Sequence, residues 1–269
     1  MTTNEYMYEL VATTHINHHI IYQGSQGAEG SYYIGICGRL QGIFSSFMII
    51  AIGDVHGTTH WKNIIAEYKE SPNDIVIFLG DYVDSFDISP EQCLENLSEL
   101  FEYKCSTPNV YMLIGNHDYH YMRHDMDRYS GYRYEWMKAY RSILLDNYHH
   151  LEIAIILQSL SKKYIFSHAG VSDVFLKDNN ITVEGLSDLW KTNPSAFGFK
   201  HNTMDCYGNH PSQGPLWIRP QALATCAVKG YEQIVGHTNV RWPYTFYSNN
   251  NDAITIVCTE DKNGFLLLK

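Results

Sequence analysis

Five short polar motifs follow apolar runs along this chain, and their side chains are of the kinds that bind divalent metal ions. Together they supply aspartate, asparagine and histidine ligands, which suit hard to borderline divalent cations. Two such ions held about 3.5–4 Å apart promote attack on phosphate esters. The motifs therefore predict a two-metal site for phosphoester hydrolysis. In chain order they are Gly53-Asp54-Val55-His56-Gly57, Gly80-Asp81-Tyr82-Val83-Asp84, Gly115-Asn116-His117-Asp118, Ser167-His168-Ala169-Gly170 and Gly236-His237-Thr238.

The spacing of the first three motifs predicts that their ligands meet at one edge of a sheet. Asp81 lies 27 residues after Asp54, and Asn116 lies 35 residues after Asp81. Each interval accommodates one strand–helix unit, and strands connected in this way run parallel with right-handed crossovers. The carboxyl ends of such strands share one edge, where ligands bind. Alternation along an extended Asp54-Val55-His56 segment would also point Asp54 and His56 the same way.

The elements that must carry these motifs alternate regularly from Met48 onward. Apolar, β-branched runs predict strands at Met48–Ile52, Ile75–Leu79 and Val110–Ile114, and helical spacing of apolar residues predicts helices at Thr59–Lys69 and Pro90–Tyr103. Ser89 before Pro90 is typical of a helix start, with the serine as N-cap and proline at the first helical position.

The second half of the chain predicts a second sheet. Two runs close together, Leu151–Leu157 and Lys163–Ser167, resemble a hairpin, and three more strands are expected at Gln233–Val235, Ile254–Cys258 and Phe265–Leu268. We expect this second sheet to be largely antiparallel and packed on the first. The predicted fold class is therefore α/β, a four-layer α/β/β/α sandwich of two packed mixed sheets flanked by helices.

Composition and charge limit the partners. The net charge is −10, from 19 Lys+Arg against 29 Asp+Glu, and an acidic surface repels a nucleic-acid backbone. The apolar runs are too short to span a bilayer, and the start of the chain has no secretory signal pattern. The six cysteines are scattered without a Cys-x-x-Cys pair, as in reduced cytoplasmic proteins. We expect a cytoplasmic protein without nucleic-acid or membrane partners.

The five motifs together resemble those of the calcineurin-like metallophosphoesterase superfamily, over roughly residues 48–240. Within it they look most like the phosphoprotein phosphatase branch and its bacterial and phage relatives, since Gly236-His237-Thr238-Asn239 lacks the second histidine of the broader Gly-His-x-His pattern. The resemblance implies two divalent ions (manganese, iron, zinc or a mixture), with Asp81 bridging both. It also implies that Asp54 and His56 bind the first ion and that the second is bound by Asn116, His168 and His237.

The predicted chemistry needs a proton donor rather than a protein nucleophile. A water between two metal ions has a strongly lowered pKa and can attack phosphorus directly. No Cys or Ser here has the surroundings that would activate it. The leaving oxygen needs a proton, which His117 beside Asn116 could supply, and the family pairing implies that Asp84 orients this imidazole. The alternative is a structural role for His117, and Asp118 is expected to cap a turn.

A cationic donor for phosphate is also required, and here the chain departs from the phosphatase branch. That branch usually has arginine after the second aspartate of its Gly-Asp-x-Val-Asp-Arg-Gly motif, and glutamate in Gly-Asn-His-Glu. This chain has Ser85 and Asp118 at those places. Leu216-Trp217-Ile218-Arg219-Pro220 resembles the Trp-x-Arg element of bacterial-type members, so Arg219 is the first candidate. Its alternative is a surface residue at the start of a helix, and Arg123 and Arg241 are weaker substrate-binding candidates.

Three segments lie outside this scheme. Residues 1–47 are expected to be an N-terminal extension to a domain at 48–269, either an edge hairpin or a poorly ordered tail, with metal binding by its histidines as an alternative. The segments Tyr119–Tyr148, whose later half Tyr132–Leu145 is predicted to be helical, and Thr192–Pro215 follow metal-type motifs. We place both at the rim of the site. The tyrosines of the first are either helix core with a solvated rim or a platform for substrate.

The sequence thus predicts an enzyme that hydrolyses phosphate esters with a metal-activated water. A phosphomonoesterase similar to serine/threonine protein phosphatases, acting on a phosphoprotein or a small phosphoester, is the first hypothesis. A nucleotide-directed hydrolase, either a symmetrical dinucleoside tetraphosphatase or a phosphodiesterase, is the alternative. A binding scaffold without catalysis is a third hypothesis, which predicts lost ligands, whereas all six ligand residues are present.

Overall fold

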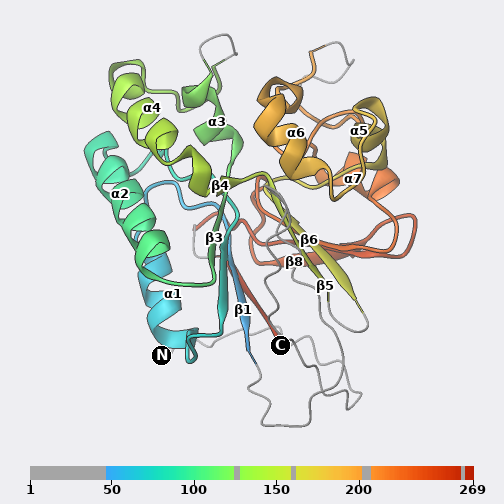
Figure 1. The fold of residues 1–269 in the computed structure, drawn as a ribbon, viewed down its shortest axis with the longest axis horizontal. Helices are drawn as coiled ribbons and strands as arrows, with labels where there is room; N and C mark the ends of the chain where they lie inside the picture. The colour runs from blue at the N-terminus through green and yellow to red at the C-terminus, as the bar shows by residue number, and fades with distance from the viewer. Residues whose placement is uncertain (1–46, 124–127, 159–161, 202–206, 262–263) are drawn as a thin grey trace.

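The computed structural model describes residues 47–123, 128–158, 162–201, 207–261 and 264–269. The predicted extension at residues 1–47 therefore lies almost wholly outside the described residues. Within them the chain forms two five-stranded sheets with helices beside each (Figure 1). In the part of the chain that is described, no helix is long and apolar enough to cross a membrane.

The first sheet carries the first three motifs. Its strands β1 to β4 run parallel to one another, and β10 pairs antiparallel with β1 at the edge. Helices α1 (His60–Tyr68) and α2 (Pro90–Ser106) connect β1 to β2 and β2 to β3. In sheet order the strands are β10 (Phe265–Leu268), β1 (Ile49–Ile52), β2 (Ile75–Phe78), β3 (Val110–Leu113) and β4 (Leu151–Glu152).

The second sheet carries the last two motifs. Its central strands β6, β7 and β9 are parallel, while β5 and β8 pair antiparallel at its two edges. Helices α5 (Asp173–Asp178), α6 (Leu186–Thr192) and α7 (Pro220–Cys226) lie beside this half of the molecule (Figure 1). In sheet order the strands are β5 (Ala154–Gln158), β6 (Lys163–Ser167), β7 (Glu232–Val235), β9 (Ala253–Ile256) and β8 (Tyr244–Tyr247).

The two faces of the first sheet have different partners because successive side chains of a strand point to opposite faces. Ala51 and Ile77 are fully buried in a cluster that includes Phe166 and Ile234 of the second sheet, so this cluster is the core between the sheets. The neighbouring residues, such as Ile50 and Val76, pack instead with the helix residues Trp61, Leu97 and Leu100. This layering confirms the predicted α/β sandwich of two mixed sheets.

Two predictions about the second sheet were wrong. It is not largely antiparallel, because β6, β7 and β9 run parallel. Phe265–Leu268 joins the first sheet as β10, where Leu266 and Leu268 face the core between the sheets. An apolar strand pattern shows that a strand is buried but not which sheet it joins, and this is why the assignment failed.

Helix and strand boundaries also differ in places. The expected strand Leu151–Leu157 is interrupted at Ile153, so that β4 pairs with β3 in the first sheet and β5 pairs with β6 in the second. The hairpin prediction is confirmed for β5 and β6. Tyr132–Leu145 is a 3₁₀ turn at Tyr134–Trp136 followed by α4 (Met137–Asp146). The short strand β8 and the helix α3 (Asn116–Met122) were not expected.

Candidate metal centre and active site

All five polar motifs lie at the carboxyl ends of strands. Asp54 follows β1 and Asp81 follows β2, while Asn116 begins α3 directly after β3. His168 and His237 follow β6 and β7, which are parallel neighbours in the second sheet. Because the strands of each set are parallel, their motifs meet at one end of the two packed sheets, as the sequence predicted.

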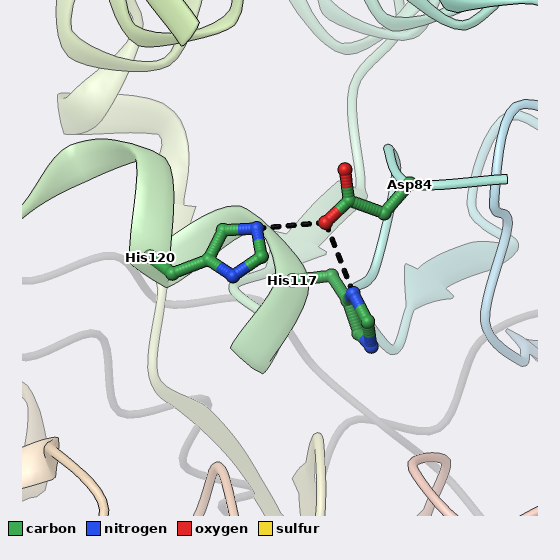
Figure 2. Close-up of side chains that lie close together, drawn as sticks. All are labelled: Asp84, His117 and His120. Carbon is green, nitrogen blue, oxygen red and sulfur yellow. Dashed lines mark hydrogen bonds and ion pairs between the residues drawn. The ribbon is translucent and has the colours of Figure 1, made fainter. Parts of the chain in front are cut away.

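Helix α3 brings two imidazoles next to a carboxylate. His117 Nδ1 lies 3.1 Å from Asp84 Oδ2, and His120, one turn later on the same helix, places Nε2 at 2.7 Å from the same oxygen (Figure 2). The Tyr121 hydroxyl donates a 2.5 Å hydrogen bond to Asp84 Oδ1. The predicted His117–Asp84 pair is therefore present. His120 and Tyr121 were not predicted as part of it, because their helical spacing from His117 becomes informative only once a helix is expected at α3.

The pKa values of this pair follow from burial and charge. Burial would lower the pKa of His117, but the negative charges of Asp81 and Asp84 outweigh it and raise the pKa to about 9. Burial would raise the pKa of Asp84, but the hydrogen bond from His117 and the nearby His120 imidazole outweigh burial and lower this pKa. In the metal-free protein His117 is thus protonated at neutral pH beside an ionised Asp84, as a proton donor requires.

Asp118 has the structural role expected of it. Its Oδ1 accepts a 2.8 Å hydrogen bond from the Tyr82 N–H, and its Oδ2 accepts one of 3.0 Å from the Gly115 N–H. These bonds tie the loop after β2 to the start of α3. The turn-capping prediction for this carboxylate is therefore confirmed.

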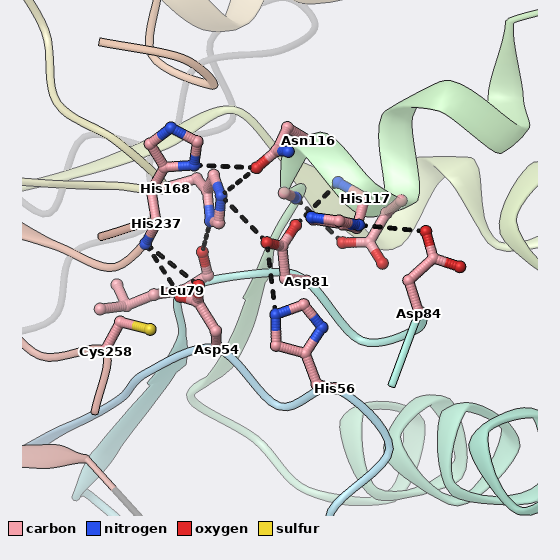
Figure 3. A network of polar contacts seen from close by, with 12 residues as sticks. Asp54, His56, Leu79, Asp81, Asp84, Asn116, His117, His168, His237 and Cys258 are labelled. Carbon is pink, nitrogen blue, oxygen red and sulfur yellow. Dashed lines mark hydrogen bonds and ion pairs between the residues drawn. The ribbon is translucent and has the colours of Figure 1, made fainter. Parts of the chain in front are cut away.

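One group of side chains offers a first metal position. Ligand atoms of Asp54, His56 and Asp81 lie within 4.8 Å of one another, and His56 Nε2 is 3.8 Å from Asp81 Oδ2 (Figure 3). The backbone N–H of His237 holds the Asp54 carboxylate with hydrogen bonds of 3.0 and 3.2 Å. The neighbouring Cys258 lies beside Asp54, and its thiol donates to Asn239 Oδ1 at 2.8 Å.

A second group converges on one amide oxygen. His168 Nε2 lies 2.8 Å and His237 Nδ1 lies 2.9 Å from Asn116 Oδ1 (Figure 3). His168 Nε2 is also 3.4 Å from Asp81 Oδ2. Asp81 therefore lies between the two groups, which is the place that the resemblance implies for a bridging ligand.

The hydrogen-bond partners of His168 and His56 fit metal binding. His168 Nδ1 faces the Leu79 carbonyl at 2.8 Å, and His56 Nδ1 faces the Val83 carbonyl at 2.8 Å. A carbonyl only accepts, so each Nδ1 carries a hydrogen, and Nε2, the nitrogen left to bind a metal, faces the carboxylate or amide oxygens. Main-chain carbonyls that fix the tautomer in this way are typical partners of metal-binding histidines.

The charges of the buried ligands support the same interpretation. Burial raises the pKa of Asp54, whereas the imidazoles of His168, His117 and His56 outweigh burial at Asp81 and lower its pKa. Burial, together with the positive charge of Arg219, holds the pKa of His237 well below its usual value. His237 is therefore neutral at pH 7, and a neutral imidazole is the form that binds metal.

Backbone geometry at the site is unusual. His56, Asp81, Asp84 and His237 have φ angles of 44°, 51°, 63° and 60°, in the left-handed region that residues with a Cβ seldom adopt. Such conformations cost free energy and occur mainly where a functional arrangement requires them. Here they turn the loops after β1, β2 and β7 so that their side chains face one another.

The arginine candidates have different surroundings. Arg219 is half-buried next to the ligand loop, where its Nη1 donates to the His237 carbonyl and to Thr238 Oγ1, both at 3.1 Å. Arg123 ends α3, and the exposed Arg241 lies 4.7 Å from the ring centroid of Trp242. Arg219 is thereby joined to the loop that carries His237, and a contact of any of the three arginines with phosphate stays a prediction.

Ser85 does not replace the family's arginine as a cation. Its hydroxyl accepts hydrogen bonds from the backbone N–H groups of Asp87 and Ile88, at 3.3 and 3.1 Å, and its carbonyl accepts one from Arg133 Nη2 at 3.1 Å. The serine therefore stabilises the loop that follows Asp84.

A comparison with known families decides the affiliation. The model of the calcineurin-like phosphoesterase family matches residues 47–241, most of the chain and all five motifs. The chain belongs to this family. Its members are metal-dependent hydrolases of phosphoric esters, and this chain is therefore such an enzyme. The superfamily predicted from the motifs is confirmed, and no curated protein sequence matches the chain.

Solved structures share the fold. A cold-active protein-tyrosine phosphatase of a psychrophilic Shewanella species is similar with a TM-score of 0.55 and 17% identity, covering 89% of this chain and 85% of that one. A protein serine/threonine phosphatase from Saccharomyces cerevisiae has a TM-score of 0.51 and 16% identity, covering 81% and 70%. Protein phosphatases are thus among the proteins that share the fold of this calcineurin-like phosphoesterase.

Proposed function

We propose that this calcineurin-like phosphoesterase is a phosphomonoesterase with two divalent metal ions. The observation that carries the proposal is the convergence of His168, His237 and Asp81 around Asn116, beside the His56 group. The ring nitrogens that face inward are Nε2 of His168, Nε2 of His56 and Nδ1 of His237. Asp54, His56 and Asp81 would hold one ion, and Asp81, Asn116, His168 and His237 the other. When bound, the two ions would supply a nucleophilic water and neutralise phosphate charge.

The remaining steps fall to protein side chains. His117 uses Nδ1 to contact Asp84, so its Nε2 is the nitrogen that faces away from that carboxylate and can deliver a proton to the leaving oxygen. Asp84 holds the ring in place and stabilises its positive charge. Arg219, at the His237 loop, would neutralise charge on the phosphoryl oxygens. No covalent intermediate with the protein is needed.

The missing arginine after Asp84 supports the alternative, a hydrolase of nucleotides. A dianionic monoester needs more neutralising charge than a diester or an internal phosphate, and an arginine fork supplies it well. With Ser85 engaged in its own loop, Arg219 is the first remaining candidate for that role.

A parallel assay of four substrates distinguishes these possibilities. Metal-loaded protein would be given an aryl phosphate, a phosphodiester, a dinucleoside tetraphosphate and a phosphopeptide, with kcat/KM measured for each. We expect the aryl phosphate and the phosphopeptide to be cleaved faster than the other two. Faster cleavage of the diester or the tetraphosphate would replace the phosphomonoesterase proposal with the nucleotide one. Full metal binding without any hydrolysis would favour a binding scaffold.

A further inference from the structure

The Asp84 carboxylate is shared by two imidazoles rather than one. His117 Nδ1 lies 3.1 Å and His120 Nε2 lies 2.7 Å from its Oδ2, and the two rings approach that oxygen from different directions (Figure 2). His120 and Asp84 have fully buried side chains, whereas 14% of the His117 side chain is exposed. The three residues therefore form a chain from the protein interior, through the carboxylate, to the partly exposed imidazole of His117 at the site.

The hydrogen positions at His120 can be assigned from its neighbours. The backbone N–H of Tyr129 points at His120 Nδ1 over 3.4 Å, so Nδ1 accepts and the hydrogen of the neutral ring is on Nε2. The Nε2 hydrogen lies on the side of the ring that faces Asp84. The Nε2–H···Oδ2 angle is nevertheless poor for a full hydrogen bond. Catalytic hydrogen bonds are often misaligned without substrate and tighten in the complex.

Aromatic rings hold His120 in this position. The Tyr129 ring is stacked on it with an interplanar angle of 6°, and the edges of Tyr121 and Tyr132 meet it at centroid distances of 4.5 and 4.8 Å. Burial lowers the pKa of His120, so the ring is neutral and adds no positive charge beside a protonated His117. Three tyrosines of the tyrosine-rich segment therefore pack around His120. Tyr121 is buried, and Tyr129 and Tyr132 are half-buried.

We propose that His120 is a positioning residue, which holds Asp84 against His117 Nδ1 so that the opposite nitrogen of His117 stays directed at the leaving oxygen. This inference rests on the proposed function. A fixed carboxylate is needed because misplacement of a catalytic group by about 1 Å can cost about 10²-fold in rate. Tyr121 fixes Oδ1 through its 2.5 Å hydrogen bond, and His120 fixes the oxygen that His117 itself uses.

Asp84, His117 and His120 could also be taken for a metal site, since their ligand atoms lie close together. The hydrogen assignment argues against it. A metal would require the lone pair of His120 Nε2, but the Tyr129 N–H already uses the lone pair of Nδ1 and leaves the hydrogen on Nε2. The contacts of 2.7 and 3.1 Å are those of hydrogen-bonded or ion-paired groups and need no ion between them.

Leaving-group dependence separates positioning from a merely structural role. His120→Ala, metal-loaded, would be compared with the unmutated protein on phenyl phosphate and on 4-nitrophenyl phosphate, whose leaving group needs little protonation. We expect kcat on phenyl phosphate to fall about 10- to 100-fold, as when other orienting partners of functional histidines are removed, and kcat on 4-nitrophenyl phosphate to fall much less. His120→Gln, whose amide can donate to Asp84, should recover most of the loss.

The matched control is Tyr119→Phe, on the same helix. It removes a buried hydrogen bond, from the Tyr119 hydroxyl to the Pro194 carbonyl at 2.8 Å, without touching Asp84. We expect lower thermal stability in this variant with no change in leaving-group preference. Equal losses on both esters in His120→Ala, or the same preference in Tyr119→Phe, would overturn the inference.

A second measurement does not depend on activity. In metal-free protein labelled with ¹⁵N-histidine, two-bond proton–nitrogen correlations report which ring nitrogen carries hydrogen. We expect His120 to be the Nε2–H tautomer, and a His120 Nδ1–H tautomer would contradict the arrangement. If the unmutated protein hydrolysed no ester, the proposed function would fail, whereas this spectrum would still decide whether His120 is positioned to hold Asp84.

Discussion

Main-chain atoms orient the side chains that are proposed to bind metal. The carbonyls of Leu79 and Val83 fix the tautomers of His168 and His56, and the N–H of His237 fixes Asp54. The motifs predicted which side chains meet, but not these partners. A carbonyl is present at every residue, so no sequence pattern marks the one that lies beside a histidine.

The role of His117 predicts a selective loss of activity at the residue scale. In His117→Asn the leaving oxygen would depart without a proton, and general acid catalysis contributes roughly 10²–10⁴-fold. We expect a loss of this size on phenyl phosphate, a much smaller one on 4-nitrophenyl phosphate, and unchanged metal content by elemental analysis. A uniform loss on both esters would count against the general-acid role.

Arg219 predicts a different kind of loss. Removing one preorganised cationic donor costs about 10²–10³-fold in turnover, so Arg219→Ala should lower kcat/KM for a monoester by about two powers of ten. Arg219→Lys should recover only part of it, because lysine lacks the planar fork. Lys62→Ala removes a cation from a surface pair with Glu99 and is the control. Unchanged monoester turnover in Arg219→Ala would assign the phosphate contact to another group.

The loops between the elements, rather than the elements themselves, create the site. At Gly236 an added Cβ would lie 2.1 Å from Asp54 Oδ1, and at Gly115 it would lie 2.1 Å from Asp81 Oδ1. The glycines in these motifs therefore leave space for the ligand carboxylates of a neighbouring loop.

Gly236→Ala accordingly tests the loop packing. The new methyl group would displace the Asp54 carboxylate, and we expect weaker binding of Mn²⁺ by calorimetry with a proportionate loss of activity. Gly185→Ala is the control, since its Cβ would lie no closer than 3.3 Å to any neighbour. Equal Mn²⁺ affinity in Gly236→Ala and the unmutated protein would show that the close approach has no bearing on the ligands.

Elements could be predicted where local pattern and tertiary role agree. The α2 start was predicted well, because Ser89 and Gln92 form a capping box around Pro90. Helix α3 was missed because a run of polar and aromatic residues after Gly115 has no apolar periodicity, although Tyr119 and Tyr121 are fully buried by the fold. The sheet of β10 depended on contacts between distant segments, which no local pattern contains.

At the scale of the whole molecule, two sheets contribute the proposed ligands to one site. Asp54, Asp81 and Asn116 come from the first sheet, and His168 and His237 come from the second. The core between the sheets therefore controls how far apart the two ligand groups lie. Sequence spacing predicted that the first three motifs meet, and their union with His168 and His237 follows from the packing of the sheets.

The boundary of the domain is a prediction at this scale. Every described strand lies between Ile49 and Leu268, and every proposed ligand lies after Met48. A chain beginning at Met48 should therefore fold with a similar melting temperature and keep most of its kcat/KM. An insoluble or inactive product would mean that residues 1–47 complete the fold or the site.

The central claim is that two metal ions bridged by Asp81 are required for monoester hydrolysis. Its most direct test is to add Mn²⁺ stepwise to metal-free protein while measuring bound metal and turnover of an aryl phosphate, with Asp81→Asn as the variant and Asp173→Asn, at the surface start of α5, as the control. We predict no turnover without metal, full turnover near two ions per chain, and loss of both metal and turnover in Asp81→Asn alone. Full turnover of the metal-free protein, or of Asp81→Asn, would contradict the claim.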